Sequence, residues 1–81
     1  MHELSIIQGI IAIINKEKEK HNFSKVNFIE IVCGRFNCAS EENLQFCYDA
    51  LADEGYLNGA KIRLKRLDDN SDVYLDKLDV D

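Results

Sequence analysis

The sequence has few of the side chains from which catalytic and metal sites are usually built. It contains two histidines and three cysteines among 81 residues. It has no Cys-x-x-Cys pair, which zinc-ribbon sites use. It also lacks a glycine-rich loop that could hold a phosphate group. These absences exclude the commonest zinc and nucleotide chemistries, and we expect no catalytic activity.

The histidines and cysteines do not combine into a catalytic group. His2 and His21 lie near the two ends of an expected helix, which places them nearly 30 Å apart, at about 1.5 Å of rise per residue. Cys33, Cys38 and Cys47 have no histidine nearby in sequence to activate a thiolate. Cys33 and Cys47 fall at apolar positions and are predicted core residues. Cys38 lies in an expected loop, and a thiol enzyme based on it is the weakest alternative.

Positive charge and long apolar runs are also scarce. The chain has ten Lys and Arg residues and fifteen Asp and Glu residues, which gives a net charge of −5. This balance argues against nucleic acid and anionic membranes as partners, because phosphate binding requires clustered cations. No segment reaches the roughly 18 apolar residues that a membrane span requires. The start does not read as a signal peptide, so we expect a cytoplasmic protein with reduced thiols.

Two helices are predicted from apolar residues that recur every three or four positions. The first covers residues 4–21 and ends at Asn22, which tolerates a left-handed cap. Its predicted apolar stripe is Leu4, Ile7, Ile11 and Ile14, widened by Ile6, Ile10 and Ile13. The second begins after Ser40, with Glu41 and Glu42 in its first turn as acids that suit a helix start. Its stripe is Leu44, Cys47, Tyr48 and Leu51, and Gly55 is the expected stop.

Three strands complete the prediction. Residues 25–33 are apolar on both faces, so cover is expected on more than one side. Residues 60–67 alternate apolar and polar side chains, and residues 73–80 are predicted as the last strand. The first and second strands could run parallel, and the last two are predicted to form an antiparallel hairpin around the turn 68–72. The fold class is therefore α+β, with two helices packed on a small mixed three-stranded sheet in the order α-β-α-β-β.

The first three residues offer one candidate metal site. The α-amine of Met1, the backbone nitrogen of His2 and its imidazole can wrap one ion in two fused chelate rings, with Glu3 as a candidate fourth ligand. Nickel(II) and copper(II) favour such square-planar nitrogen sites. The first four N–H groups of a helix have no partner within the helix, so a metal at this end would not disturb the hydrogen-bond ladder.

Four segments together resemble a known family. They are MHELSIIQGI at the start, EENLQFCYDAL, GYLNGAKIRLKRL and the closing VYLDKLDVD. They are similar to the HypA/HybF family of hydrogenase maturation proteins, and MHELS is the most specific of them. Glu41 stands where family members usually have proline, and either residue suits the first position of a helix.

The resemblance implies a function and partners. It implies a small metallochaperone that binds nickel(II) weakly through Met1, His2 and Glu3. It implies delivery of nickel to the large-subunit precursor of [NiFe]-hydrogenase together with a HypB-type GTPase. In some bacteria urease maturation proteins are further partners. The alternative is an interaction module that binds no metal and docks on a maturation GTPase or an enzyme precursor.

The chain departs from the family at one place. Members of the family insert a zinc-ribbon module with two Cys-x-x-Cys pairs before the last strand, whereas this chain has only the turn 68–72, DDNSD. A predicted hairpin would bring the two strand ends together, so a short turn could replace the insertion. We therefore expect residues 1–81 to form a single nickel-binding core domain without structural zinc.

Overall fold

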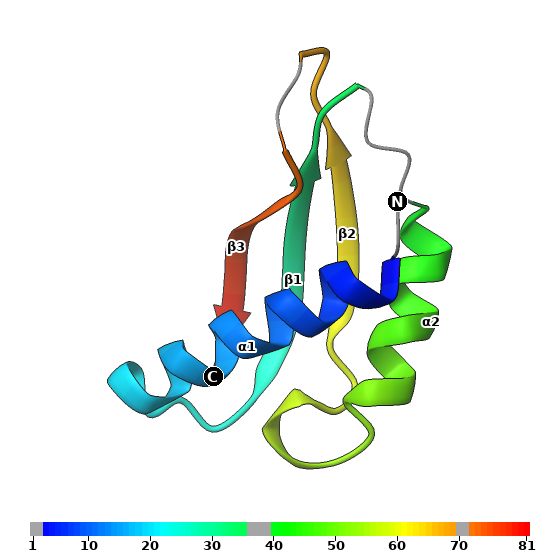
Figure 1. Ribbon diagram of the computed structural model, residues 1–81. Coiled ribbons are helices and arrows are strands. Elements are labelled where there is room, and N and C mark those ends of the chain that lie inside the picture. Colours follow the sequence, from blue (N-terminus) through cyan, green and yellow to red (C-terminus); the bar gives the residue numbers. More distant parts are fainter. Residues whose placement is uncertain (1–2, 36–39, 70–71) are drawn as a thin grey trace.

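The computed structural model describes residues 3–35, 40–69 and 72–81. Two helices lie against a three-stranded sheet, in the chain order α1, β1, α2, a short 3-10 helix η1, β2 and β3 (Figure 1). The predicted α+β class, with two helices on a small mixed three-stranded sheet, is confirmed.

The first helix, α1, spans Glu3–His21. It ends as predicted, because Asn22 adopts a φ of 48° and its N–H donates to the carbonyl of Lys18 over 2.9 Å. The buried line of α1 is narrower than the predicted apolar face. It runs through Ile7, Ile10 and Ile14, while Ile11 is half-buried and Leu4 is 48% exposed.

The second helix, α2, spans Glu41–Leu51. Ser40 caps it as predicted, since its Oγ accepts a hydrogen bond from the Asn43 N–H over 3.2 Å. The predicted stop at Gly55 is wrong: the helix ends at Leu51, and Gly55, with a φ of 76°, starts η1, Gly55–Leu57. The buried Tyr48 hydroxyl donates to the Leu57 carbonyl and ties η1 to α2.

The sheet corrects the predicted strand order. Its strands are β1 (Val26–Cys33), β2 (Lys61–Arg66) and β3 (Tyr74–Val80), arranged β2-β1-β3. β1 and β2 are parallel, as predicted, but β3 pairs antiparallel with β1 and not with β2. The predicted hairpin of the last two strands is therefore wrong. β1 is apolar on both faces, and the central place gives it a neighbour along each edge.

The connection from β2 to β3 crosses the end of β1. The Leu67 N–H donates to the Cys33 carbonyl over 2.9 Å, and the Arg35 N–H donates to the Asp69 carbonyl over 2.8 Å. The strands that it joins are two strand spacings apart, which is roughly 10 Å. A short segment covers that distance easily, at up to about 3.3–3.6 Å per residue. The start of this connection therefore lies at the end of β1 and does not close a hairpin between β2 and β3.

The core lies between the helices and one face of the sheet. Ile29 and Ile31 of β1 pair in register with Ile62 and Leu64 of β2, and all four point toward α1 and α2. Both helices pack on this face, so neither provides the expected cover on the second face. The second face, which we call the open face, is centred on the half-buried Phe28 and Glu30 of β1, and Val32 on the same face is buried.

Candidate functional site

The predicted metal-binding residues lie at the start of α1. Glu3 is the first residue of the helix and is half-buried, whereas Met1 and His2 lie outside the described residues. Glu3 suits this position because a carboxylate is stabilised by the positive end of the helix dipole. The backbone N–H groups of the first turn have no acceptor within the helix, and they immediately follow the predicted chelating residues.

The rest of the described chain does not supply a second cluster of metal ligands. No group of three or more His, Cys, Asp or Glu side chains that could hold a metal ion occurs within residues 3–35, 40–69 and 72–81. His21 ends α1, 18 residues after Glu3, and its Nε2 lies 3.8 Å from Oε1 of Glu17. At about 1.5 Å per residue, His21 lies roughly 27 Å from the start of the helix. It cannot contribute to a site there within one chain.

The described cysteines have structural surroundings. Cys33 is fully buried, and Nη1 of Arg66 donates to its Sγ over 3.6 Å. Cys47 is half-buried against the core, and both thiols are free. These positions agree with the predicted core roles of Cys33 and Cys47. Cys38 lies outside the described residues.

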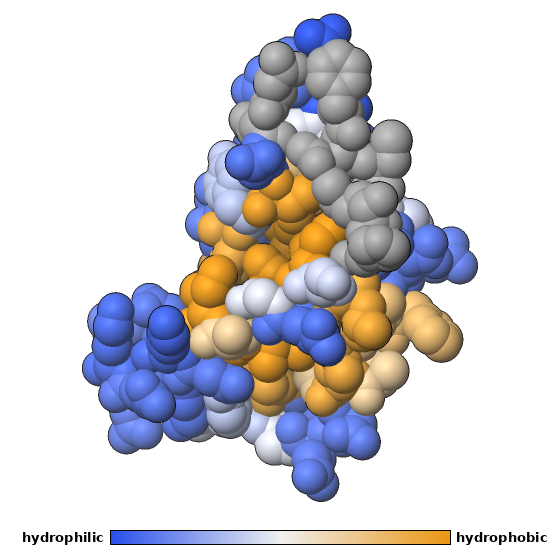
Figure 2. Space-filling model, viewed as in Figure 1, coloured by the Kyte–Doolittle hydropathy of each residue, from blue (hydrophilic) through white to orange (hydrophobic). Residues whose placement is uncertain are grey.

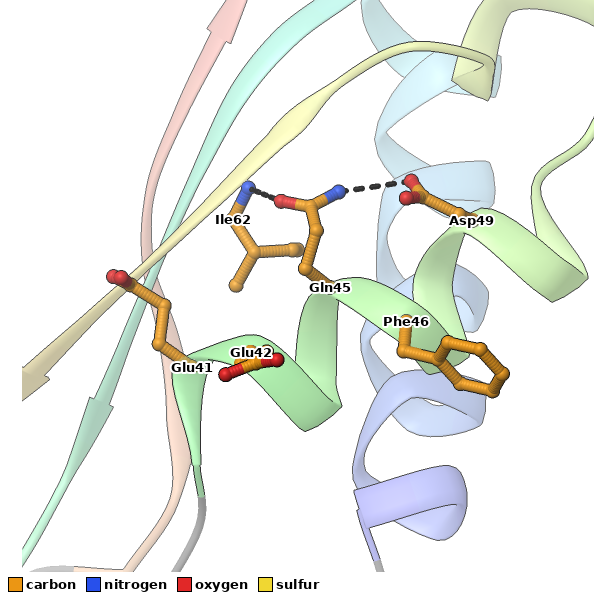
Figure 3. A pocket seen from close by; sticks show the side chains of 6 residues that line it. All are labelled: Glu41, Glu42, Gln45, Phe46, Asp49 and Ile62. Carbon is orange, nitrogen blue, oxygen red and sulfur yellow. Dashed lines mark hydrogen bonds between the residues drawn. The ribbon is translucent and has the colours of Figure 1, made fainter.

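A concave surface of about 430 Å³ lies between α2 and β2, and sequence reasoning did not identify it (Figure 3). In the figure Gln45 and Glu41 extend toward β2, whereas Phe46 points away from the sheet. Oε1 of Gln45 accepts from the Ile62 N–H over 2.7 Å, and Nε2 donates to the Ala60 carbonyl over 3.1 Å. Oε1 of Glu41 accepts from the Leu64 N–H over 2.8 Å.

These contacts make the concave surface a structural element. Gln45 and Glu41 form hydrogen bonds with backbone groups on the outer edge of β2. A neighbouring strand would otherwise use these groups. Nε2 of Gln45 also donates to Oδ1 of Asp49 over 2.9 Å. The sequence signal was the spacing of four between Glu41, Gln45 and Asp49, which places them on one side of a helix. Glu41 and Glu42 are first-turn acids, as predicted.

Tyr48 is a buried titratable group with a strongly shifted pKa. Its side chain is fully buried in the core between α1, α2 and the sheet. Burial raises the pKa of Tyr48 to about 12, and the nearby charges of Asp49 and Tyr56 act in the same direction. A phenol with this pKa stays protonated at neutral pH and serves as a hydrogen-bond donor. Its role is to hold η1 against α2.

Comparison with known proteins identifies the family. The model of the family described as "Hydrogenase/urease nickel incorporation, metallochaperone, hypA" matches residues 1–71. The chain is 38% identical over 64 residues to hydrogenase maturation factor HypA 2 of Bradyrhizobium diazoefficiens, a match that covers 79% of this chain and 57% of that protein. The chain belongs to the HypA family.

A second relative agrees with this assignment, and one solved structure shares the fold. The chain is 36% identical over 62 residues to the hydrogenase maturation factor HypA of Methylocella silvestris, covering 76% of this chain and 55% of that protein. The fold resembles the solution structure of the nickel metallochaperone HypA from Helicobacter pylori, with a TM-score of 0.60 at 18% identity. That likeness covers 95% of this chain and 72% of the other. The chain thus spans slightly more than half of the length of the curated relatives that it matches.

The surface over the helices is partly apolar. Figure 2 shows hydrophobic side chains gathered in the middle of the face that α1 crosses, with hydrophilic ones around the C-terminal part of α1. Leu4 and Ile13 of α1 are each about half exposed, and Phe46 of α2 is 74% exposed. Neither α1 nor α2 is long and apolar enough to cross a membrane, and no other described helix is.

Proposed function

We propose that the chain binds nickel(II) at its N-terminus and delivers it during maturation of [NiFe]-hydrogenase, without catalysis. The observation that carries this proposal is the family match, which includes Met1, His2 and Glu3. The amine of Met1 and the amide and imidazole nitrogens of His2 supply three donors, and Glu3 supplies the fourth. Nickel(II) is the cargo, and nitrogen-rich square-planar coordination suits it.

The position of these residues supports the proposal. Met1 and His2 precede Glu3, the first described residue of α1, and the N–H groups at the start of a helix have no acceptor within it. Binding would require loss of the amide proton of His2. The expected affinity is weak, because a carrier has to release its ion. We propose a HypB-type GTPase and the hydrogenase large-subunit precursor as partners. Urease maturation proteins are proposed as further partners.

The test is a nickel(II) titration of protein with a free, untagged N-terminus. We expect one weakly bound ion and a square-planar absorption band at neutral to alkaline pH. His2→Ala, or acetylation of the Met1 amine, should abolish both. His21→Ala is the matched control and should bind nickel as the unaltered protein does. Survival of the band in His2→Ala would show that the ligands are wrongly assigned.

The exposed apolar side chains of α1 and α2 favour a second candidate function. Leu4 and Ile13 are about half exposed and Phe46 is 74% exposed, and exposed apolar side chains of this size can contact another protein. On this alternative the chain binds no metal and docks on a maturation GTPase or an enzyme precursor. Association with a HypB-type GTPase that His2→Ala leaves unchanged, together with no detectable nickel binding, would favour it.

A further inference from the structure

The open face of the sheet carries an unusual distribution of charge. Lys61, Arg63 and Lys65 of β2 alternate with the inward-facing Ile62 and Leu64. They pair in register with the central residues of the open face, at Phe28, Glu30 and Val32. From the other side, Lys77 of β3 pairs with Glu30. The four cations therefore surround the middle of one sheet surface.

This surface is positive within a negative molecule. The carboxylates of Glu30 and Asp79 pair in register there, and exposed Asp76 lies in the β3 bulge beside Lys77, so the four cations exceed the acids by one charge. The whole chain has a net charge of −5. Among the described residues, Lys61, Lys65 and Lys77 form no ion pair. Their charges are therefore available to a partner and are not neutralised within the chain.

The open face also carries aromatic groups. The Arg63 guanidinium carbon lies 4.6 Å from the centre of the Phe28 ring, which fixes both side chains against the sheet. Tyr74 of β3 pairs in register with Val32 and is 43% exposed. Aromatic and arginine side chains are enriched among the residues that dominate protein–protein binding. An exposed tyrosine among lysines has the composition of a docking surface with a polar rim.

The arrangement favours a protein partner over a nucleic acid. Arg63 already covers one face of the Phe28 ring, so a base cannot stack on that face. Glu30 lies between two cations, and one of its carboxylate oxygens is buried without a hydrogen-bond partner. Glu30 and Asp79 would both repel a phosphate backbone. A protein surface can place acids against the lysines and still avoid these two carboxylates.

We propose that the open face docks an acidic surface of a partner protein. Lys61, Lys65 and Lys77 supply long-range attraction and orientation, and Tyr74 supplies apolar contact. α1 lies on the opposite face of the sheet, so a partner on the open face leaves the start of α1 accessible (Figure 1). The docking surface thus lies on the other side of the sheet from Glu3, and its existence does not depend on nickel binding.

The test uses a defined acidic probe. A fluorescent peptide of glutamates with interspersed leucines is titrated with the full chain at low and at moderate salt. We expect binding that weakens with salt and amide NMR shifts confined to the three strands. The double variant Lys61→Glu/Lys65→Glu should bind at least about tenfold more weakly. It keeps Arg63 on Phe28, and it should bind nickel unchanged.

Matched controls make the result specific. Lys16→Glu/Lys20→Glu changes the net charge equally on exposed positions of α1 and should bind the peptide within about twofold of the unaltered chain. Lys61→Gln/Lys65→Gln replaces the first variant if circular dichroism shows that charge reversal disturbs folding. The proposal is overturned by absence of peptide binding, by equal losses in the two double variants, or by tighter binding of a single-stranded oligouridine.

Discussion

At the scale of single residues, buried polar groups fix the path of the chain. Tyr48 is fully buried and donates to the Leu57 carbonyl, so one hydroxyl joins α2 to η1. Gln45 uses both ends of its amide, one on the Ile62 N–H and the other on the Ala60 carbonyl. Each of these side chains forms a hydrogen bond with a backbone group that has no partner within a helix or the sheet. Such contacts contribute more by avoiding unpaired polar groups than by their own strength.

Tyr48→Phe tests the first of these contacts. Loss of the hydroxyl leaves the Leu57 carbonyl without its donor, and we expect the free energy of unfolding to fall by about 1 kcal/mol at pH 7. Chemical denaturation followed by circular dichroism measures this change. Tyr74→Phe is the control, because Tyr74 is 43% exposed and should tolerate the change. Equal stability of the two variants would contradict the role given to Tyr48.

The pKa of Tyr48 predicts a pH dependence. The pKa is raised in the folded chain, from 10.0 to about 12. The folded state therefore holds this proton over a range where the unfolded state releases it, so stability falls as the pH rises. The contribution is complete below pH 10 and is lost as the pH rises toward 12. The slope of unfolding free energy against pH should be shallower in this window for Tyr48→Phe than for Tyr74→Phe.

At the scale of elements, the two edges of the sheet differ. The outer edge of β2 is occupied by Gln45 and Glu41 of α2, whereas the outer edge of β3 has no neighbouring strand in the described chain. An unoccupied edge can pair with another chain. α2 therefore has two functions: its apolar side fills the core, and its polar side protects β2.

Gln45→Leu tests the protection of the β2 edge. The variant removes the partners of Ile62 and Ala60, and we expect a loss of about 1–3 kcal/mol in unfolding free energy. It should also associate more readily in sedimentation measurements, because β2 becomes open to pairing. Gln8→Leu places the same change on an exposed position of α1 and should shift stability by less than about 0.5 kcal/mol. Indistinguishable behaviour of the two variants would argue against edge protection.

At the scale of the whole molecule, one apolar core joins every element. Its buried residues come mainly from α1, β1, α2 and β2 and are nonpolar apart from the Tyr48 hydroxyl, and the partly buried Leu75 and Leu78 of β3 pack against them. The described residues contain no metal-holding group that could stabilise the fold in place of the core. A domain of this size has only modest stability, but burial of large apolar side chains contributes roughly 1.5–3 kcal/mol each.

Chelation tests whether this core is sufficient. We expect the thermal midpoint of the chain to be the same with and without EDTA, within about 1 °C, because folding draws on apolar burial and not on a bound ion. Circular dichroism during heating measures this. A lowered midpoint or loss of helical signal in the chelator would show that a metal ion contributes to the fold.

The strand order shows where prediction from the sequence fell short. The charges of β2 and β3 suggested that these strands pair, but exposed cross-strand pairs contribute only about 0.2–1 kcal/mol each. The central position of β1 keeps Ile29, Ile31 and Val32 within 2% exposure, and such burial contributes roughly 1.5–3 kcal/mol per side chain. Burial therefore decides the order. The candidate metal site rests on Met1, His2 and Glu3 and stays a prediction for the nickel titration.

The sequence by itself determined the local features: five main elements in their order, the Ser40 cap, the Asn22 end of α1 and the family. These depend on neighbours a few residues apart, so spacing and residue type suffice. Tertiary structure alone decided that β1 is central, that Gln45 protects β2 and that one sheet face gathers the cations. Those features join residues distant in sequence, and the burial of the whole core selects among the pairings that local patterns allow.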